Sequence, residues 1–257
     1  MVPRWMVRDM NIHALWCHPR SVSTAFERIM RERGDLSVLH EPFMYHHYLT
    51  STDRLFPEFT PDPGHPETYA DIRAMILEKA RTAPVFFKDM AYYVADALPQ
   101  DAAFAGQMSH AFLLRDPVEA ALSYARLDPD FTCLELGHEA QHRLYQALLA
   151  MGHTPLVLTA DQLRDAPQRT LQRYWTHVGL EFAEHAFTWD NRVPEGWQSV
   201  KGWHREVLQS GAIHRPKSAD AAAELAKLGG RYAEYAAHHA PFYAQMRGIA
   251  EAQAHQK

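Results

Sequence analysis

The chain has 257 residues, of which 47% are hydrophobic and 22% charged, and its formal net charge is -5 at pH 7. This composition is typical of a soluble globular protein and excludes a disordered chain. The acidic balance argues against a general nucleic-acid binder, which is usually basic, but it leaves room for a local cationic pocket.

No apolar run in the sequence approaches the roughly 18–20 residues that a membrane helix needs. Residues 1–10 carry charges and lack the apolar stretch of a secretory signal. The two cysteines, Cys17 and Cys133, are too few for a disulfide framework. We therefore expect a cytoplasmic protein without a membrane partner. No stretch has the composition of a linker, so we expect a single domain over residues 1–257. A homo-oligomer is left open.

Five short apolar runs are nearly continuous rather than alternating, which indicates strands buried on both faces, as in a parallel sheet covered by helices. They are residues 12–17, 36–39, 85–87, 111–114 and 156–158. Segments with helical spacing lie between them, and Phe26, Ile29 and Met30 share one helical face. The alternation predicts a three-layer α/β fold, a parallel sheet of about five strands flanked by helices.

Two stretches are predicted to be irregular. Residues 56–66 hold four prolines and a glycine, which excludes a regular element. Residues 189–214 mix Gly, Pro, Trp and His and predict a long loop. The following segment, residues 219–239, has an amphipathic helical pattern and is expected to pack on the core. Its predicted buried face holds Leu225, Leu228, Tyr232 and Tyr235.

The first apolar run leads into a possible anion site, His-Pro-Arg-Ser-Val-Ser-Thr at residues 18–24. Thr24 and Glu27 have the spacing of a capping box with Thr24 as the N-cap. A loop between a buried strand and a helix presents backbone N–H groups and the positive end of the helix dipole. Arg20 adds a positive charge. The alternative is a capped helix after a turn with a surface arginine. No glycine occurs in residues 1–33 and the loop has no lysine, which argues against a magnesium-dependent ATPase or GTPase.

The fourth apolar run leads into a second site. Asp116 suits an N-cap, Pro117 the first helical position, and Glu119 a capping box. Arg115 stands at the carboxyl end of a strand, where open α/β sheets bind ligands, and Ser123 follows about two helical turns later. An arginine with a hydroxyl suits a phosphate. The alternative is an ion pair of Arg115 with Asp116 or Glu119.

Together these motifs resemble those of the sulfotransferase family that uses 3′-phosphoadenosine 5′-phosphosulfate, PAPS. Residues 19–24 resemble that family's loop for the 5′-phosphosulfate, and Arg115 with Ser123 resembles its 3′-phosphate site. A third stretch, residues 160–180, is similar to the family's "YEDL…DP…L…FLGL" segment. The resemblance covers residues 11–180.

The resemblance implies a P-loop NTPase-like sulfotransferase fold that needs no metal, with PAPS as donor and adenosine 3′,5′-bisphosphate as product. It also implies a small-molecule acceptor. The implied contacts to the 5′-phosphosulfate are Arg20, Ser21, Val22, Ser23 and Thr24; those to the 3′-phosphate are Arg115 and Ser123; Lys201 and Gly202 are the remnant of a C-terminal nucleotide-binding signature. Ala160 stands where the family often has a tyrosine near the adenine, so the adenine contact is left open.

Sulfuryl transfer also needs a base that removes the acceptor's proton, and a positioned base contributes about 10²–10⁴-fold. The best candidate is Glu41, which follows the second apolar run as a glutamate does in bacterial carbohydrate-type members of the family. Many animal members of the family have a histidine base on the third strand, but residues 87–90 of this chain contain no histidine. His40 and Asp89 are the alternatives to Glu41. Lys88 either assists the sulfonyl oxygens or pairs with an acid.

Other classes of function are weighed against this one. An ATP-dependent kinase-like phosphotransferase and a non-catalytic nucleotide-binding protein are kept as alternatives. A serine hydrolase is disfavoured because no Gly-x-Ser-x-Gly elbow surrounds Ser21 or Ser23. A metal is not expected, because the histidine pairs 46–47 and 238–239 are adjacent in the chain and adjacent side chains point apart.

Overall fold

The structure is a computed structural model that describes residues 11–54, 56–190, 192–194, 197 and 220–255. Its centre is one parallel sheet with the strand order β2-β3-β1-β4-β5. The strands are β1 (Ile12–Cys17), β2 (Ser37–His40), β3 (Val85–Met90), β4 (Met108–Leu114) and β5 (Leu156–Thr159). The predicted α/β fold with a parallel sheet is confirmed.

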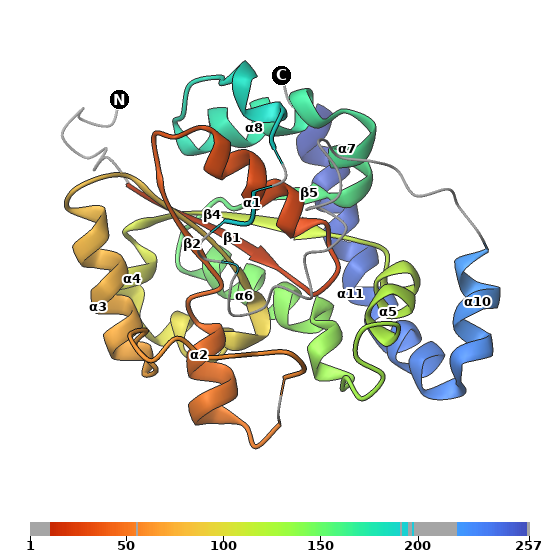
Figure 1. Cartoon of the computed structure of the whole chain (residues 1–257). Coiled ribbons are helices and arrows are strands. Elements are labelled where there is room, and N and C mark those ends of the chain that lie inside the picture. The colour runs from red at the N-terminus through yellow and green to blue at the C-terminus, as the bar shows by residue number, and fades with distance from the viewer. Residues whose placement is uncertain (1–10, 55, 191, 195–196, 198–219, 256–257) are drawn as a thin grey trace.

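Helices cover both faces of this sheet (Figure 1): α1 and α8 lie above it in the view, and α3, α4 and α6 lie below it. The helices are α1 (Ser23–Glu32), α2 (Met44–His46), α3 (Tyr69–Ala80), α4 (Ala102–Ala105), α5 (Pro117–Ala125), α6 (His138–Ala150), α7 (Ala160–Asp165), α8 (Pro167–Val178), α10 (Ala221–Leu228) and α11 (Gly230–His255). The described part of the proline-rich segment, residues 56–66, holds no helix or strand, as predicted. Among the described helices none is both long and apolar enough to cross a membrane.

The layers explain why the strand sequences are continuously apolar. Every residue of β1, β3 and β4 is buried. Above the sheet, Phe26 of α1 packs between Tyr174 of α8 and Phe86 of β3, with ring centroids 4.9 and 6.1 Å apart. A central strand covered on both faces offers no solvent-facing position, so the alternation of half-buried strands is lost.

The predicted start of α1 is wrong. Its N-cap is Val22, and no side chain caps the helix. Thr24 therefore does not form a capping box with Glu27. The Glu27 carboxylate is fully buried and accepts hydrogen bonds from Arg31 Nε at 2.8 Å and Trp197 Nε1 at 2.7 Å. These partners hold the side chain inside the protein, where it cannot turn back to the first helical turn.

The single helix predicted over residues 219–239 is also wrong. The chain breaks at Gly229, whose φ of 136° suits a residue without a Cβ. The break separates α10 from α11, which continues to residue 255. Leu225 and Tyr232 are buried as predicted, but Leu228, the last residue of α10, is 46% exposed.

Two histidines of the sheet are buried and neutral. His13 in β1 and His110 in β4 are nearly inaccessible. Burial lowers the pKa of His13 to about 4 and that of His110 to about 3. In the unfolded chain both titrate near 6.5. At a pH between the folded-state and unfolded-state pKa values the unfolded chain binds more protons than the folded protein. The contribution of these two histidines to the free energy of unfolding is therefore fully present above about pH 6.5 and is lost as the pH falls.

We predict that the free energy of unfolding falls on acidification from about pH 6.5, by about 1.4 kcal/mol per pH unit for each such histidine. His110→Phe removes one of these groups and should make the slope shallower by that amount. Urea denaturation of both proteins at several pH values between about 7 and about 5 measures the two slopes. Equal slopes would show that His110 is not held neutral by the fold.

Candidate functional site

The loops after β1 and β4 meet at the point of the sheet from which the chain leads to opposite edges. After β1 the chain runs through α1 to β2 at one edge, and after β4 it runs to β5 at the other edge. β1 and β4 are neighbours, so their carboxyl ends form the switch point of the sheet, where proteins with such sheets bind ligands in a crevice. Arg115 Nη1 donates to the backbone oxygen of Arg20 at 3.0 Å. The two predicted phosphate motifs therefore lie side by side.

The backbone near this crevice is strained. In the described part of the chain four non-glycine residues have positive φ, and three of them are predicted site residues: Arg20 at 64°, Val22 at 69° and Glu41 at 40°. Such a conformation is rare for non-glycine residues, above all β-branched ones, and costs about 1–3 kcal/mol at each position. Strain of this kind clusters at active sites and ligand clamps, which supports the assignment of both segments.

The loop after β1 has the groups that an anion needs. Helix α1 has ten residues, and its first-turn amides lack acceptors within the helix. Ser21 and Ser23 are buried, and Thr24 lies in the first turn. The hydroxyl of Ser21 makes no hydrogen bond within the described residues. An unpartnered buried hydroxyl beside a helix N-terminus fits a ligand oxygen.

The arginine of this loop reaches the second motif directly. Arg20 Nε donates to Ser123 Oγ at 2.8 Å, so the predicted contacts to the two ends of the nucleotide lie close together. Arg115 Nε donates to Glu119 Oε2 at 2.9 Å, and Arg164 Nη1 donates to the same oxygen at 3.3 Å. The ion pair weighed as the alternative for Arg115 is present, together with the contact to the loop.

The start of α5 follows the prediction in part. Asp116 is the N-cap, and its Oδ1 accepts the amides of Val118 at 2.9 Å and Glu119 at 3.2 Å. Pro117 occupies the first helical position. The Glu119 carboxylate bonds two arginines and is not part of a capping box.

Positive charge is concentrated here. Burial and the charge of Arg164 lower the pKa of Arg115, Glu119 opposes this, and Arg20 lowers it further. An arginine stays protonated in spite of such a shift, so the guanidinium groups repel one another. A bound anion relieves this repulsion with charge-assisted hydrogen bonds.

A second cluster lies at the ends of β2 and β3. His40 pairs with Lys88 in the sheet register, and the Glu41 amide donates to the Lys88 oxygen at 3.0 Å. The side chains of Lys88 and Glu41 form an ion pair, with Lys88 buried and Glu41 nearly so. Tyr93 adds a hydrogen bond to Glu41 Oε2 at 3.3 Å. Burial alone would lower the pKa of Lys88, but Glu41 and Glu27 raise it above the ordinary value.

The two alternative bases are engaged elsewhere. Asp89 is fully buried and accepts the Phe43 amide at 2.9 Å. Burial and the neighbouring charge of Glu41 raise the pKa of Asp89 well above its ordinary value. His40 Nδ1 lies 2.6 Å from Glu27 Oε2. Each of the three candidate bases thus has a partner among the described residues, and the partner of Glu41 is Lys88.

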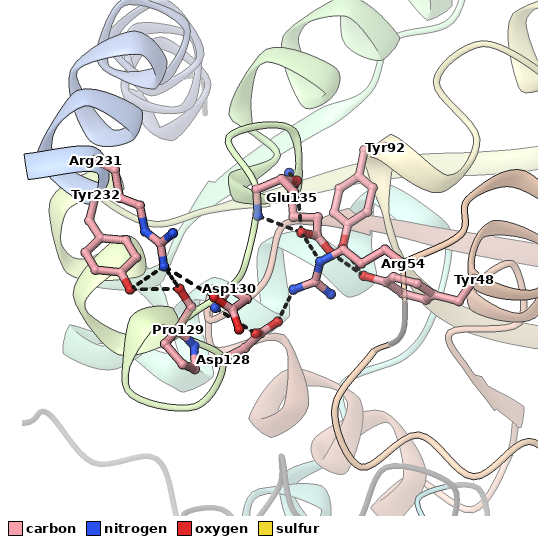
Figure 2. A network of polar contacts seen from close by, with 10 residues as sticks. Tyr48, Arg54, Tyr92, Asp128, Pro129, Asp130, Glu135, Arg231 and Tyr232 are labelled. Atoms are coloured by element: carbon pink, nitrogen blue, oxygen red, sulfur yellow. Dashed lines mark hydrogen bonds and ion pairs between the residues drawn. The ribbon is translucent and has the colours of Figure 1, made fainter. Parts of the chain in front are cut away.

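The segment after β2 is held in place by a polar network (Figure 2). Tyr48 donates to Glu135 Oε1 at 2.9 Å, and its hydroxyl lies 3.1 Å from that of Tyr92. Arg54 Nε lies 3.0 Å from Glu135 Oε2, and Arg54 also pairs with Asp128. Both carboxylates are buried. The network therefore fixes this segment against the loop before α6.

Sequence reasoning missed three contributors. His18 bonds the Arg115 amide, Tyr93 bonds Glu41, and Arg164 shares Glu119 with Arg115. His18 was visible as the first residue of the loop, and Arg164 directly follows the first part of the third motif. Lys201 and Gly202 lie outside the described residues.

The side chains of His238 and His239 were expected to point apart, but they lie close together. His238, His239 and Cys133 each offer one possible ligand atom, all within 4.8 Å. His239 Nδ1 accepts the Glu139 amide at 3.2 Å, and its Nε2 lies 2.7 Å from the Cys133 oxygen. Because both ring nitrogens of His239 bond the backbone, the pair joins α11 to the loop before α6.

A five-stranded parallel sheet with helices on both faces places the chain in the class of α/β proteins with a P-loop-like fold. A family model described as "Sulfotransferase domain" matches residues 10–250, and the chain belongs to this family. Solved structures share the fold. The sulfotransferase domain of the Synechococcus PCC 7002 olefin synthase superposes with a TM-score of 0.52 at 16% identity, covering 91% of this chain and 94% of that one. The sulfotransferase domain from the curacin biosynthetic pathway superposes with a TM-score of 0.50 at 12% identity, covering 88% and 96%.

The chain is also similar to two Arabidopsis thaliana proteins named branched-chain-amino-acid aminotransferase-like proteins 2 and 1. Each is 26% identical, over 209 and 215 residues, or 80% and 82% of this chain. The matches cover 36% and 38% of those proteins, so the chain spans little more than a third of the length of these curated relatives.

The ion pair between Lys88 and Glu41 makes a prediction that does not depend on the reaction. Lys88→Met leaves a carboxylate without its cation at a buried site and should lower the free energy of unfolding by about 3 kcal/mol. The double variant Lys88→Met/Glu41→Gln should lose less than the sum of the two single variants. Chemical denaturation of the three variants measures the coupling. Additive losses would mean that the pair contributes no interaction.

Proposed function

We propose that this chain transfers a sulfuryl group from PAPS to a hydroxyl or amine of a small-molecule acceptor. Membership of the sulfotransferase-domain family supplies the class of reaction. The observation that carries the choice of donor is the contact of Arg115 with the Arg20 oxygen. This contact supports the proposal, because it brings together the two motifs assigned to the two ends of a nucleotide that carries phosphates on two different ribose positions.

The side chains fit such a donor. Arg20 and the loop residues Ser21, Val22, Ser23 and Thr24 would hold the 5′-phosphosulfate through amides, hydroxyls and one guanidinium. Arg115 and Ser123 would hold the 3′-phosphate. Ala160 is buried at the start of α7 and offers no ring for the adenine.

The reaction is an in-line displacement at sulfur, for which phosphoryl transfer is the nearest worked analogue. The acceptor oxygen forms a bond to sulfur while the bond from sulfur to the phosphate oxygen breaks, and the bisphosphate leaves with the electron pair. Glu41 takes the acceptor's proton. Arg20 and the amides of α1 stabilise the charge that grows on the leaving phosphate. Lys88 now bonds Glu41, and in this scheme it turns to the sulfuryl oxygens, which releases the base.

Two other functions are kept as outcomes of the test. An ATP-dependent kinase-like phosphotransferase is disfavoured by a loop without glycine or lysine. A non-catalytic nucleotide-binding protein would bind without transfer. Calorimetric titration with PAPS, adenosine 3′,5′-bisphosphate and magnesium ATP separates the donors, and a radiolabelled sulfate-transfer screen against small metabolites detects turnover. Absence of affinity for both PAPS and the bisphosphate would refute the proposal.

For the base, we predict that Glu41→Gln lowers turnover by ~10² or more and leaves PAPS affinity nearly unchanged, because the amide cannot take a proton. Turnover with the acceptor found in the screen and calorimetry with the bisphosphate measure the two effects. Glu78→Gln, an exposed glutamate of α3, serves as the control. Unchanged turnover in Glu41→Gln would remove Glu41 from the mechanism.

For the 3′-phosphate site, we predict that Arg115→Ala weakens binding of adenosine 3′,5′-bisphosphate by about 10-fold or more, since a charge-assisted bond is lost. Adenosine 5′-phosphate lacks the 3′-phosphate and should lose much less. Arg126→Ala is the matched control, because Arg126 closes the same helix but pairs with Glu224 at the surface. Equal losses for the two ligands would contradict the assignment.

A further inference from the structure

We propose that His18 and His138 are positioning residues whose rings form a clamp on the backbone amide and the backbone oxygen of Arg115 and so set the place of its guanidinium. The proposal deepens the proposed function and rests on it, since it assumes that Arg115 receives the 3′-phosphate.

The clamp is formed by two hydrogen bonds to one residue. The Arg115 amide donates to His18 Nε2 at 2.9 Å, and the Arg115 oxygen lies 2.7 Å from His138 Nε2, which donates to it. Both rings are buried, and their centroids are only 3.9 Å apart. The backbone amide and the backbone oxygen of Arg115 are thus both hydrogen-bonded by side chains. Backbone groups of this kind need a partner when they are buried.

The hydrogen bonds define the tautomer of each ring. His18 accepts at Nε2, so its proton is on Nδ1, which lies 2.9 Å from the Pro19 oxygen and donates to it. His138 carries its proton on Nε2. Burial and the charges of His138 and Arg115 hold the pKa of His18 well below its ordinary value, and burial lowers the pKa of His138 to about 3. Two neutral rings can stack closely, whereas two protonated rings would repel.

Local packing brings the two rings together. Gly137 precedes α6 with a φ of 83°, and a Cβ there would lie 2.8 Å from the Cβ of His18. The turn therefore needs glycine to bring His138 onto His18. One helical turn further, Gln141 Nε2 donates to the oxygens of Trp16 and Leu113 at 3.0 Å each. The start of α6 thus fixes the ends of β1 and β4 together.

The clamp joins the two halves of the candidate donor site. His18 belongs to the loop after β1 and bonds the backbone of the residue after β4. The Arg115 side chain returns to the same loop through the Arg20 oxygen. A shift of the Arg115 backbone therefore moves its guanidinium relative to Arg20, and displacement of a charged donor by about 1 Å from its partner can cost about 10²-fold. This is the reason to assign the rings to positioning of the donor.

The experiment uses two substitutions of His138 in the whole chain. His138→Phe keeps a buried ring and removes the donor to the Arg115 oxygen, whereas His138→Gln keeps an N–H donor. For His138→Phe we expect about 10-fold weaker binding of adenosine 3′,5′-bisphosphate, with adenosine 5′-phosphate unchanged. The KM for PAPS should rise by about 10-fold while kcat changes by less than about 2-fold. His138→Gln should recover most of the loss.

His110→Phe is the matched control, because His110 is also a buried histidine, and it bonds Trp16 and Ala105 instead of Arg115. Should His138→Phe fail to fold, His18→Met removes the other half of the clamp and carries the same expectation. Equal weakening of both ligands, or of neither, would overturn the positioning role. A wild-type protein that binds no bisphosphate would instead overturn the proposed function, and the assignment of the clamp with it.

Discussion

The hydrogen bond from the Arg115 guanidinium to the backbone oxygen of Arg20 joins the two halves of the candidate site, and it brings like charges together. Arg164 adds a third guanidinium through the shared Glu119 carboxylate. In a chain with a net charge of -5, such a concentration is a local feature of the crevice. The Glu119 carboxylate offsets part of the repulsion between these like charges, and the anionic donor of the proposed function would offset more of it.

The ion pair of Lys88 and Glu41 also places charge inside the protein, but here the two charges are opposite. Lys88 lies within a strand that is buried throughout, and the charge of Glu41 compensates it. A well-packed apolar pair would be at least as stable as a buried ion pair. Polar side chains in a core strand therefore point to chemistry more than to stability. Lys88 lies opposite Leu15 of β1 in the sheet register, two residues before the end of that strand.

The sequence predicts the sheet well because burial on both faces leaves a pattern that local residues carry by themselves. The cap at Asp116 is equally local, since its acceptors lie two and three residues away. The β3 strand extends beyond its predicted end at residue 87. The prediction stops there because charged residues such as Lys88 and Asp89 are typical of loops. Only the fold shows that Glu41, 47 residues away, neutralises Lys88. Glu27 fails as a capping residue for the same reason, since one of its partners is Trp197, 170 residues away.

The loop after β1 contains no glycine, so contacts with the surrounding residues must hold its strained backbone. Arg20 and Val22 take up the left-handed conformation that glycine adopts without penalty, at a cost of about 1–3 kcal/mol each. Glycine would relieve that strain but would also allow the loop many other conformations in the absence of ligand. Here the Arg20 oxygen is held by Arg115 and the Pro19 oxygen by the ring of His18. A loop held at successive carbonyls has its amides directed in advance, which is the preorganisation that the proposed role in stabilising a developing charge requires.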